Sequence, residues 1–206
     1  NFFSFFKYWK IATPDFRKVV PGLLLFALFN SSDIFLLLIT KETIGENTLT
    51  ILGVTFNSDT ITIGAYIFYN LIYAAASYPM GILADKLGFK KVLLLGFLLF
   101  ATVYGGFAFN PSIGLIFILF SIYGIYAAST EGVIKAWITN LAHKENTATA
   151  IGFYTSCESV CALFASIIAG ALWTNFGSNS TFITTAVISL LVFIYFLLRI
   201  RNSATQ

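Results

Sequence analysis

Apolar residues gather into six long runs along the chain, and short polar links separate them. A helix rises 1.5 Å per residue, so about 20 apolar residues cross the roughly 30 Å hydrocarbon core of a bilayer. The pattern therefore predicts an all-α, polytopic membrane protein with six transmembrane helices. The predicted helices cover 19–39, 60–83, 91–109, 113–141, 147–176 and 181–198, with 1–18 as the end of a basic linker and 199–206 as a tail.

Composition supports a protein whose solvent is lipid. The chain is 58% apolar and only 10% charged, whereas a soluble domain carries about 25% charged residues. Twelve basic and nine acidic residues are too few to cover a soluble globule of 206 residues. This composition excludes a disordered chain and argues against a soluble enzyme. The net charge of +3 does not indicate nucleic-acid binding, because the basic residues lie in clusters between apolar runs.

The distribution of basic residues predicts the orientation in the membrane. Ten of them fall on one side of a six-span arrangement and only Lys41 falls on the other. Basic links stay on the cytoplasmic side, so both termini should be cytoplasmic and the 40–59 link external. The ten are Lys7, Lys10, Arg17, Lys18, Lys86, Lys90, Lys91, Lys144, Arg199 and Arg201.

Several kinds of chemistry are excluded by the residues present. Cys157 and Cys161 lie four apart in one apolar run and cannot build a disulfide framework or a zinc site. His143 stands alone in a polar link, so a bis-histidine haem site cannot form. There is no Gly-x-Ser-x-Gly elbow and no Walker motif. We therefore expect no enzyme activity, no cofactor and no metal.

Small residues recur every four positions in two of the predicted helices. Such rows let helix backbones approach closely in lipid. They predict packing faces on the helices at 113–141 and 147–176. The two rows are Gly124, Ala128, Gly132 and Ala136, and Ala162, Ser166 and Gly170.

Ionisable residues inside the predicted spans are candidate functional groups, because charge is costly in hydrocarbon. Asp33 lies roughly 21 Å and Glu158 roughly 16 Å from the cytoplasmic start of its helix. Either acid could carry a proton, although Asp33 could also be a helix-end acid near the external headgroups. Glu131 and Lys135 are four apart and predict an ion pair on one helix face.

Polar side chains accompany these acids and complete the candidate pathway for substrate or protons. Tyr66 and Tyr73 are seven residues apart and share one helix face. Tyr123 and Tyr126 place further hydroxyl groups on the helix at 113–141. Ordinary interhelical hydrogen bonding is the alternative explanation for all of them. The candidates are Asn30, Asn70, Tyr66, Tyr73 and Tyr123.

The link between the second and third predicted helices carries a motif. Residues 81–91 read Gly-Ile-Leu-Ala-Asp-Lys-Leu-Gly-Phe-Lys-Lys, with Phe89 at a position where a basic residue is expected. This resembles the G-x-L-x-D-R-x-G-R-K signature of major facilitator transporters, which lies in the same link of each half. The matching residues are Gly81, Leu83, Asp85, Lys86, Gly88, Lys90 and Lys91.

The resemblance extends over about 13–198 and implies the C-terminal six helices of a twelve-helix transporter. Such a half consists of two inverted three-helix repeats, and the similarity of residues 30–33 to 128–131 agrees with this. The implied function is secondary active transport of a small solute by alternating access in a bacterial inner membrane. The implied partner is the N-terminal six-helix half. A non-transporting six-span receptor or assembly subunit is the alternative.

The resemblance also implies that Asp85 is part of a gating latch. An acid is favourable near the start of another helix, where unpaired N–H groups carry partial positive charge. We therefore expect Asp85 beside residues 147–150, with Gly81 and Gly88 permitting a sharp turn between the two helices.

Overall fold

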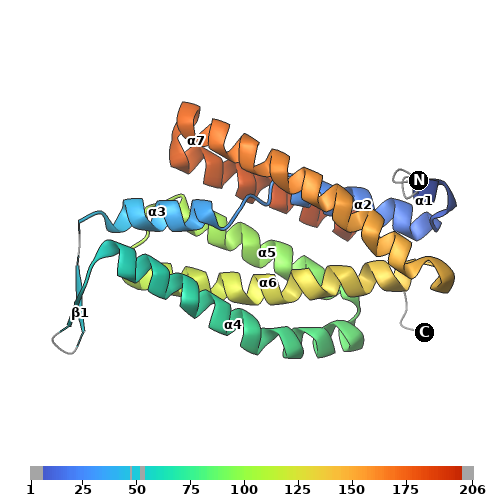
Figure 1. Cartoon of the computed structure of the whole chain (residues 1–206), viewed down its shortest axis with the longest axis horizontal. Coiled ribbons are helices and arrows are strands. Elements are labelled where there is room, and N and C mark those ends of the chain that lie inside the picture. Colours follow the sequence, from blue (N-terminus) through green and yellow to red (C-terminus); the bar gives the residue numbers. More distant parts are fainter. Residues whose placement is uncertain (1–6, 47, 52–53, 201–206) are drawn as a thin grey trace.

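The long helices run side by side along one axis, with a β-hairpin at one end and α1 at the other (Figure 1). The computed structural model describes residues 7–46, 48–51 and 54–200 of the 206-residue chain. The helical elements are α1 (Tyr8–Ile11), α2 (Pro14–Ala27), α3 (Ile34–Ile44), α4 (Ser58–Leu87), α5 (Phe89–Phe107), α6 (Ile113–Leu141), the short 3-10 helix η2 (Lys144–Asn146) and α7 (Thr147–Arg199). The strands β1 (Leu49–Ile51) and β2 (Val54–Phe56) pair antiparallel, with Thr50 opposite Thr55.

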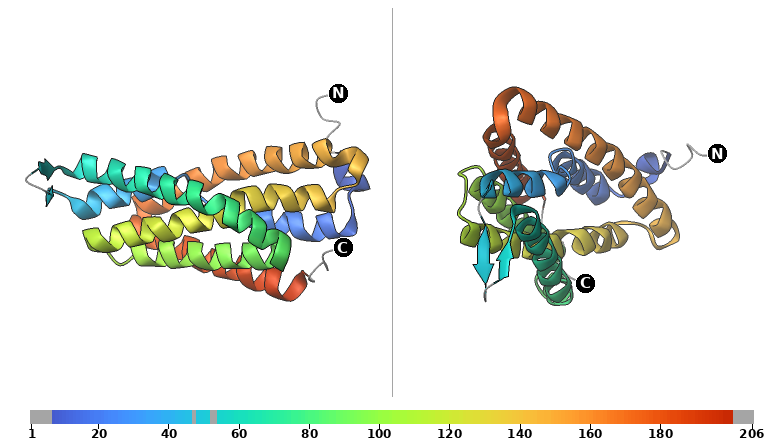
Figure 2. Two further views of the ribbon diagram at one scale, coloured as in Figure 1. Left: turned by 90° about the horizontal axis from the view of Figure 1, so that it is seen from below. Right: turned by 60° about the vertical axis from the view of Figure 1, so that its left-hand side comes forward.

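Four helical stretches of the described chain are long and apolar enough to cross a membrane, and they contain five of the predicted helices. They are 58–87, 89–107, 113–141 and 144–199. The last stretch contains two of the predictions, because α7 reverses direction at Gly177, where φ is 83° (Figure 2). A positive φ of this size favours glycine, so a single residue makes the reversal between the helices predicted at 147–176 and 181–198. The inverted-repeat arrangement stays a prediction.

The single helix predicted for 19–39 is wrong in its middle. Helix α2 ends at Ala27 and helix α3 begins at Ile34, with non-helical backbone between them. The intervening sequence includes Asn30 and Ser31, whose polar side chains compete with the helical backbone hydrogen bonds. Ser32 does so directly, since its Oγ accepts the Ile34 N–H at 3.4 Å. The first apolar run therefore forms two short helices and a break.

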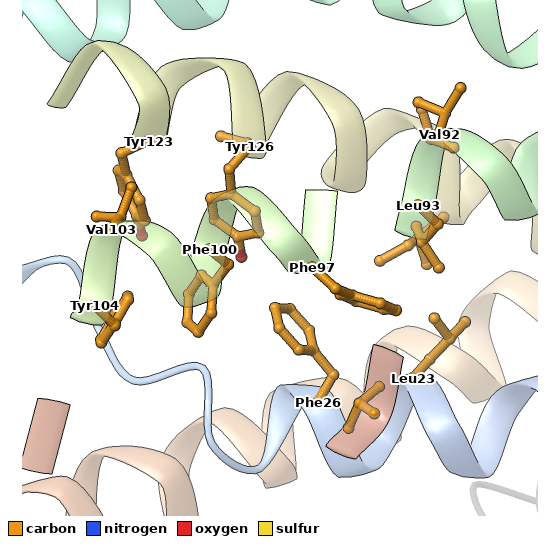
Figure 3. Close-up of a cluster of buried hydrophobic side chains, with 14 of the residues drawn as sticks. Leu23, Phe26, Val92, Leu93, Phe97, Phe100, Val103, Tyr104, Tyr123 and Tyr126 are labelled. Carbon is orange, nitrogen blue, oxygen red and sulfur yellow. The ribbon is translucent and has the colours of Figure 1, made fainter. Parts of the chain in front are cut away.

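The core is built from aromatic rings of α2, α5 and α6 (Figure 3). Phe26 of α2 lies 4.6 Å from Phe97 and 5.0 Å from Phe100 of α5, measured between ring centroids. Phe100 in turn lies 4.2 Å from Tyr104 and 4.8 Å from Tyr126 of α6. This cluster fixes the packing around the break, because the α2–α3 connection passes beside Tyr104 in Figure 3.

The predicted small-residue rows are confirmed only in part. On α6, Gly124 and Ala128 are buried, whereas Gly132 and Ala136 are exposed. A Cβ atom at Gly124 would lie 2.9 Å from Ile72 of α4, so α4 and α6 approach closely there. On α7 the predicted row is wrong in its register. Ala162 is exposed, and the buried small residues of this arm are Ala150, Ala165 and Ala169.

The basic links meet at the end of the bundle that holds α1. The α1–α2, α4–α5 and α6–α7 junctions and the end of α7 all lie there (Figure 1). Lys90 donates to the carbonyl oxygens of Leu197, at 3.3 Å, and of Ile200. A cation at this position is also stabilised by the partial negative charge at the C-terminal end of α7. The predicted clustering of basic segments at one end is therefore confirmed, while the side of the membrane stays a prediction.

Candidate functional site

Asp33 is the centre of the candidate site, because it accepts hydrogen bonds from two other helices. Tyr123 of α6 donates to Asp33 Oδ1 at 2.6 Å. Tyr69 of α4 lies at the limit of hydrogen bonding, 3.5 Å from Asp33 Oδ2. The carboxylate is half-buried at the break between α2 and α3. The predicted candidates Asp33 and Tyr123 therefore lie together.

The position of Asp33 at the start of α3 explains why its side chain is available. An aspartate at a helix N-cap ordinarily accepts the backbone N–H two or three residues later. Asp33 makes no such capping hydrogen bond. Its side chain instead turns toward α4 and α6, so the carboxylate connects three helices rather than completing its own.

Tyrosines of α4 and α6 form a continuous row of rings next to Asp33. On α4, Tyr69 lies 5.5 Å from Tyr66 and 6.5 Å from Tyr73, between ring centroids. Tyr69 also lies 5.0 Å from Tyr123, which lies 5.1 Å from Tyr126 of α6. We call these five side chains the tyrosine row. Its α4 members share one face because they are spaced three and four residues apart.

The other end of the tyrosine row reaches Glu131 of α6. Tyr73 donates to Glu131 Oε2 at 2.8 Å. The predicted ion pair between Glu131 and Lys135 is wrong, since the ion pairs within the described residues are Lys18–Asp15 and Lys41–Asp59. The four-residue spacing permits that pair, but the carboxylate of Glu131 instead accepts the hydrogen bond from Tyr73 on the neighbouring helix. Both Glu131 and Lys135 are exposed on the bundle surface.

Glu158 lies apart from this row, on the first arm of α7. Tyr154, one turn earlier on the same helix, donates to Glu158 Oε1 at 2.8 Å. The carboxylate is half-buried, and Ala162, one turn later, is exposed. Glu158 therefore lies at the edge of a face that the described chain leaves open, and its part in a pathway stays a prediction.

The two predicted asparagines contribute mainly to local structure. Asn70 is exposed, and its Nδ2 donates to the carbonyl oxygen of Tyr66 at 2.8 Å within α4. The Asn30 backbone N–H donates to the carbonyl oxygen of Phe26 at 2.9 Å and helps to end α2. Asn30 thus marks the break, and neither amide belongs to the tyrosine row.

The motif residues divide between a cavity and a turn. Gly81 and Asp85 line a cavity of about 260 Å³ between α4 and α6, together with Tyr73, Ser77, Ala84, Phe89, Ala128, Gly132, Val133 and Ala136. These lining residues come from α4, α5 and α6, and the expected place of Asp85 beside residues 147–150 stays a prediction. Gly88 alone makes the turn, with φ 92°, while Gly81 lies inside α4. Lys86 and Lys91 are exposed.

Two residues of the site were missed by the sequence analysis, and spacing could have found one of them. Tyr69 lies three residues after Tyr66 and four before Tyr73, so it belongs to the same face. Tyr104 of α5 had no comparable signal, because only the fold brings it beside the break. Within the described residues no group of three His, Cys, Asp or Glu side chains could hold a metal ion.

Comparison with known proteins identifies the family. The model of the Major Facilitator Superfamily matches residues 22–206. The chain belongs to the Major Facilitator Superfamily. This confirms the resemblance of the 81–91 motif, and the apolar helices make the chain an integral membrane protein.

Individual relatives in this superfamily match part of their own length. An uncharacterized MFS-type transporter of Methanocaldococcus jannaschii is 38% identical over 131 residues, which is 64% of this chain and 33% of the relative. The multidrug efflux pump LfrA of Mycolicibacterium smegmatis is 31% identical over 126 residues, 59% of this chain and 24% of the pump. The MFS-type transporter YybF of Bacillus subtilis, also uncharacterized, is 23% identical over 197 residues, 95% of this chain and 47% of YybF. The chain thus spans about half the length, or less, of these relatives.

Proposed function

We propose that this chain is the C-terminal six-helix half of a secondary transporter that moves a small solute by alternating access. The observation that carries the proposal is the tyrosine row and its two acids, Asp33 beside Tyr69 and Tyr123 and Glu131 beside Tyr73. Polar and ionisable side chains are costly between membrane helices. A transport pathway needs such groups, whereas a helix bundle that serves only as an anchor does not. Membership in the superfamily favours this function over a receptor or an assembly subunit.

The missing partner is the N-terminal six-helix half, which would pack against the open faces of α4, α6 and α7. The match to 47% of YybF supports this arrangement. The basic links support a cytoplasmic position for both ends of the half, in the plasma membrane of a bacterium or archaeon. Alternating access would then be the rocking of the two halves around a shared site.

The substrate that best fits the site is a small organic cation, moved outward. Tyrosine faces attract cations, and the exposed carboxylate of Glu131 lies at the end of the row. LfrA, one of the relatives, is a multidrug efflux pump. Proton entry through Glu158 or Asp33 would drive the export.

Export of a fluorescent organic cation by the full-length protein in proteoliposomes tests the site. Ethidium is a suitable probe, with a proton gradient imposed across the membrane. We expect Glu131→Gln to lower export at least tenfold and Tyr73→Phe to lower it several-fold, because the variants remove the charge and its hydrogen bond. Tyr78→Phe on the same helix is the matched control, since Tyr78 is 78% exposed. Parent-level export by Glu131→Gln would refute this site.

A second variant separates substrate binding from proton coupling. If Glu158 takes up the proton, Glu158→Gln should abolish concentrative export but leave downhill exchange of substrate intact, because the neutral amide can no longer gain or lose charge. Asp33→Asn in the same assay shows which of the two acids is coupled. Unchanged concentrative export in both variants would remove both acids from the proton pathway.

A further inference from the structure

The break between α2 and α3 leaves buried polar atoms without partners. The hydroxyls of Ser31 and Tyr104 are in residues that are 4% and 1% exposed, and neither makes a hydrogen bond within the described chain. Residues 28–30 are half-buried, and no backbone hydrogen bond of the described chain ends on their carbonyl oxygens. Unsatisfied polar groups are costly at membrane depth, so non-helical backbone persists only where something satisfies it.

Ser31 and Tyr104 bring their unpartnered hydroxyls to the break beside Asp33. The Tyr104 hydroxyl lies close to the side chains of Ser31 and Tyr123 and within reach of the Asp33 charge, although it meets hydrogen-bond geometry with none of them. Figure 3 shows the α2–α3 connection passing Tyr104, with Tyr123 projecting from α6 on the same side. The negative end of the 14-residue helix α2 also faces this break. All the available donors to a ligand are oxygen atoms.

The charge at the break favours a cation of single charge. Within the described residues Asp33 has no ion-pair partner. A lone carboxylate with hydroxyl and carbonyl oxygens around it suits a hard cation. A divalent ion would leave one positive charge uncompensated in a low-dielectric setting, which is strongly unfavourable.

We propose that the break is a binding site for a dehydrated alkali-metal cation, held by the Asp33 carboxylate, the hydroxyls of Ser31 and Tyr104 and backbone carbonyls of 28–30. Discontinuous membrane helices use unwound carbonyls and helix C-terminal ends in this way to bind ions. The ion would satisfy the unpartnered atoms and hold α2, α3 and α5 together. This site is distinct from the proposed substrate contacts at Tyr73 and Glu131, and its existence does not depend on the transport function.

Ion-dependent stability of the purified full-length protein tests the proposal. The thermal unfolding midpoint is measured in NaCl, in KCl and in choline chloride at equal ionic strength. A bound ion stabilises the folded protein by mass action, so we expect a saturable rise with one alkali ion over choline. The salt that gives the rise at lower concentration identifies Na⁺ or K⁺ as the preferred ion. Equal midpoints in the three salts at all concentrations would overturn the proposal and leave water as the occupant.

Three variants locate the ion. Asp33→Asn should abolish the alkali response, and Tyr104→Phe should raise the dissociation constant by about tenfold or more, measured by calorimetry. Tyr8→Phe is the matched control, because Tyr8 is also 1% exposed with an unpartnered hydroxyl but lies in α1. If Asp33→Asn does not fold, the comparison of Tyr104→Phe with Tyr8→Phe decides. An undiminished response in Asp33→Asn, or equal affinities in the two Phe variants, would refute the site.

Failure of this site and failure of the proposed function give different results. Export of ethidium that continues in choline, by a protein without any alkali response, would remove the ion site and leave the transport function standing. A protein that binds the ion but moves no solute would refute the transport function and leave the ion site standing.

Discussion

Substitution of Gly124 by Ala would test the close approach of α4 and α6 that holds the tyrosine row together. The added Cβ would lie 2.9 Å from two side-chain atoms of Ile72 and from the backbone carbonyl oxygen of Tyr69. Rotation of the Ile72 side chain would move its Cγ2 atom, but its Cβ atom and the Tyr69 carbonyl are fixed to the α4 backbone and cannot move alone. The two helices must therefore separate. Overpacking of this kind costs about 1–3 kcal/mol.

Helix propensity partly offsets this cost, so the measurement needs a matched variant. Ala is favoured over Gly inside a helix by about 1 kcal/mol. Gly64→Ala on α4 gains the same propensity without a clash, since nothing lies within 4 Å of a Cβ there. The difference between the two variants isolates the overpacking cost. We expect Gly124→Ala to be about 1–3 kcal/mol less stable than Gly64→Ala, which is roughly a 5- to 150-fold change in the unfolding equilibrium.

The assay is reversible unfolding of the full-length protein in mixed micelles with increasing SDS, followed by tryptophan fluorescence. Transport should also fall in Gly124→Ala, because the rings of Tyr69 and Tyr123, now 5.0 Å apart, would be displaced from Asp33. Equal stability of the two variants would show that α4 and α6 are not held at this distance. It would also remove the geometric basis of the tyrosine row.

Three further predictions concern the motif acid, the orientation in the membrane and the Lys90 contact. Asp85→Asn should lower transport at unchanged protein abundance if the motif acid stabilises the closed state, and equal transport would make it a solvated acid. Single cysteines at Glu46 and at Lys91, in a cysteine-free background, should react with impermeant maleimide from opposite sides of the membrane, and labelling of both from outside would refute the orientation. Lys90→Met should lower the thermal midpoint more than Lys86→Met does, because only Lys90 bonds the last carbonyls of α7.

The long helices could be predicted from the sequence because apolar run length alone decides them. The prediction for 113–141 matches α6 in full. Each of the other long helices differs from its own prediction by a few residues at each end. The hairpin at 49–56 was missed, since three-residue strands give too short an alternation to recognise. The break after Ala27 was missed because the apolar residues on both sides of it together make a run long enough to be read as one span.

The candidate site could be predicted only as separate residues. The acids were found because charge inside an apolar run is conspicuous, whereas their partners depend on tertiary contacts. Tyr73 reaches Glu131 across 58 positions of sequence, and Tyr123 reaches Asp33 across 90. Spacing on one helix favoured Lys135 as the partner of Glu131. Spacing alone carries no information about side chains of other helices, so the phenol of Tyr73 could not be compared with Lys135.

The broken first span has a consequence for how the protein is made. Helix α2 has 14 residues and α3 has 11, so they reach about 21 Å and 16 Å, and neither crosses the roughly 30 Å of hydrocarbon alone. When this segment leaves the ribosome, Asp33 has none of its hydroxyl partners, and an aspartate at mid-membrane costs about 2.5–3.5 kcal/mol during insertion. Tyr69 and Tyr123 are synthesised 36 and 90 residues later. The first crossing is therefore completed by helices that follow it, and the insertion machinery must retain the nascent segment until they arrive.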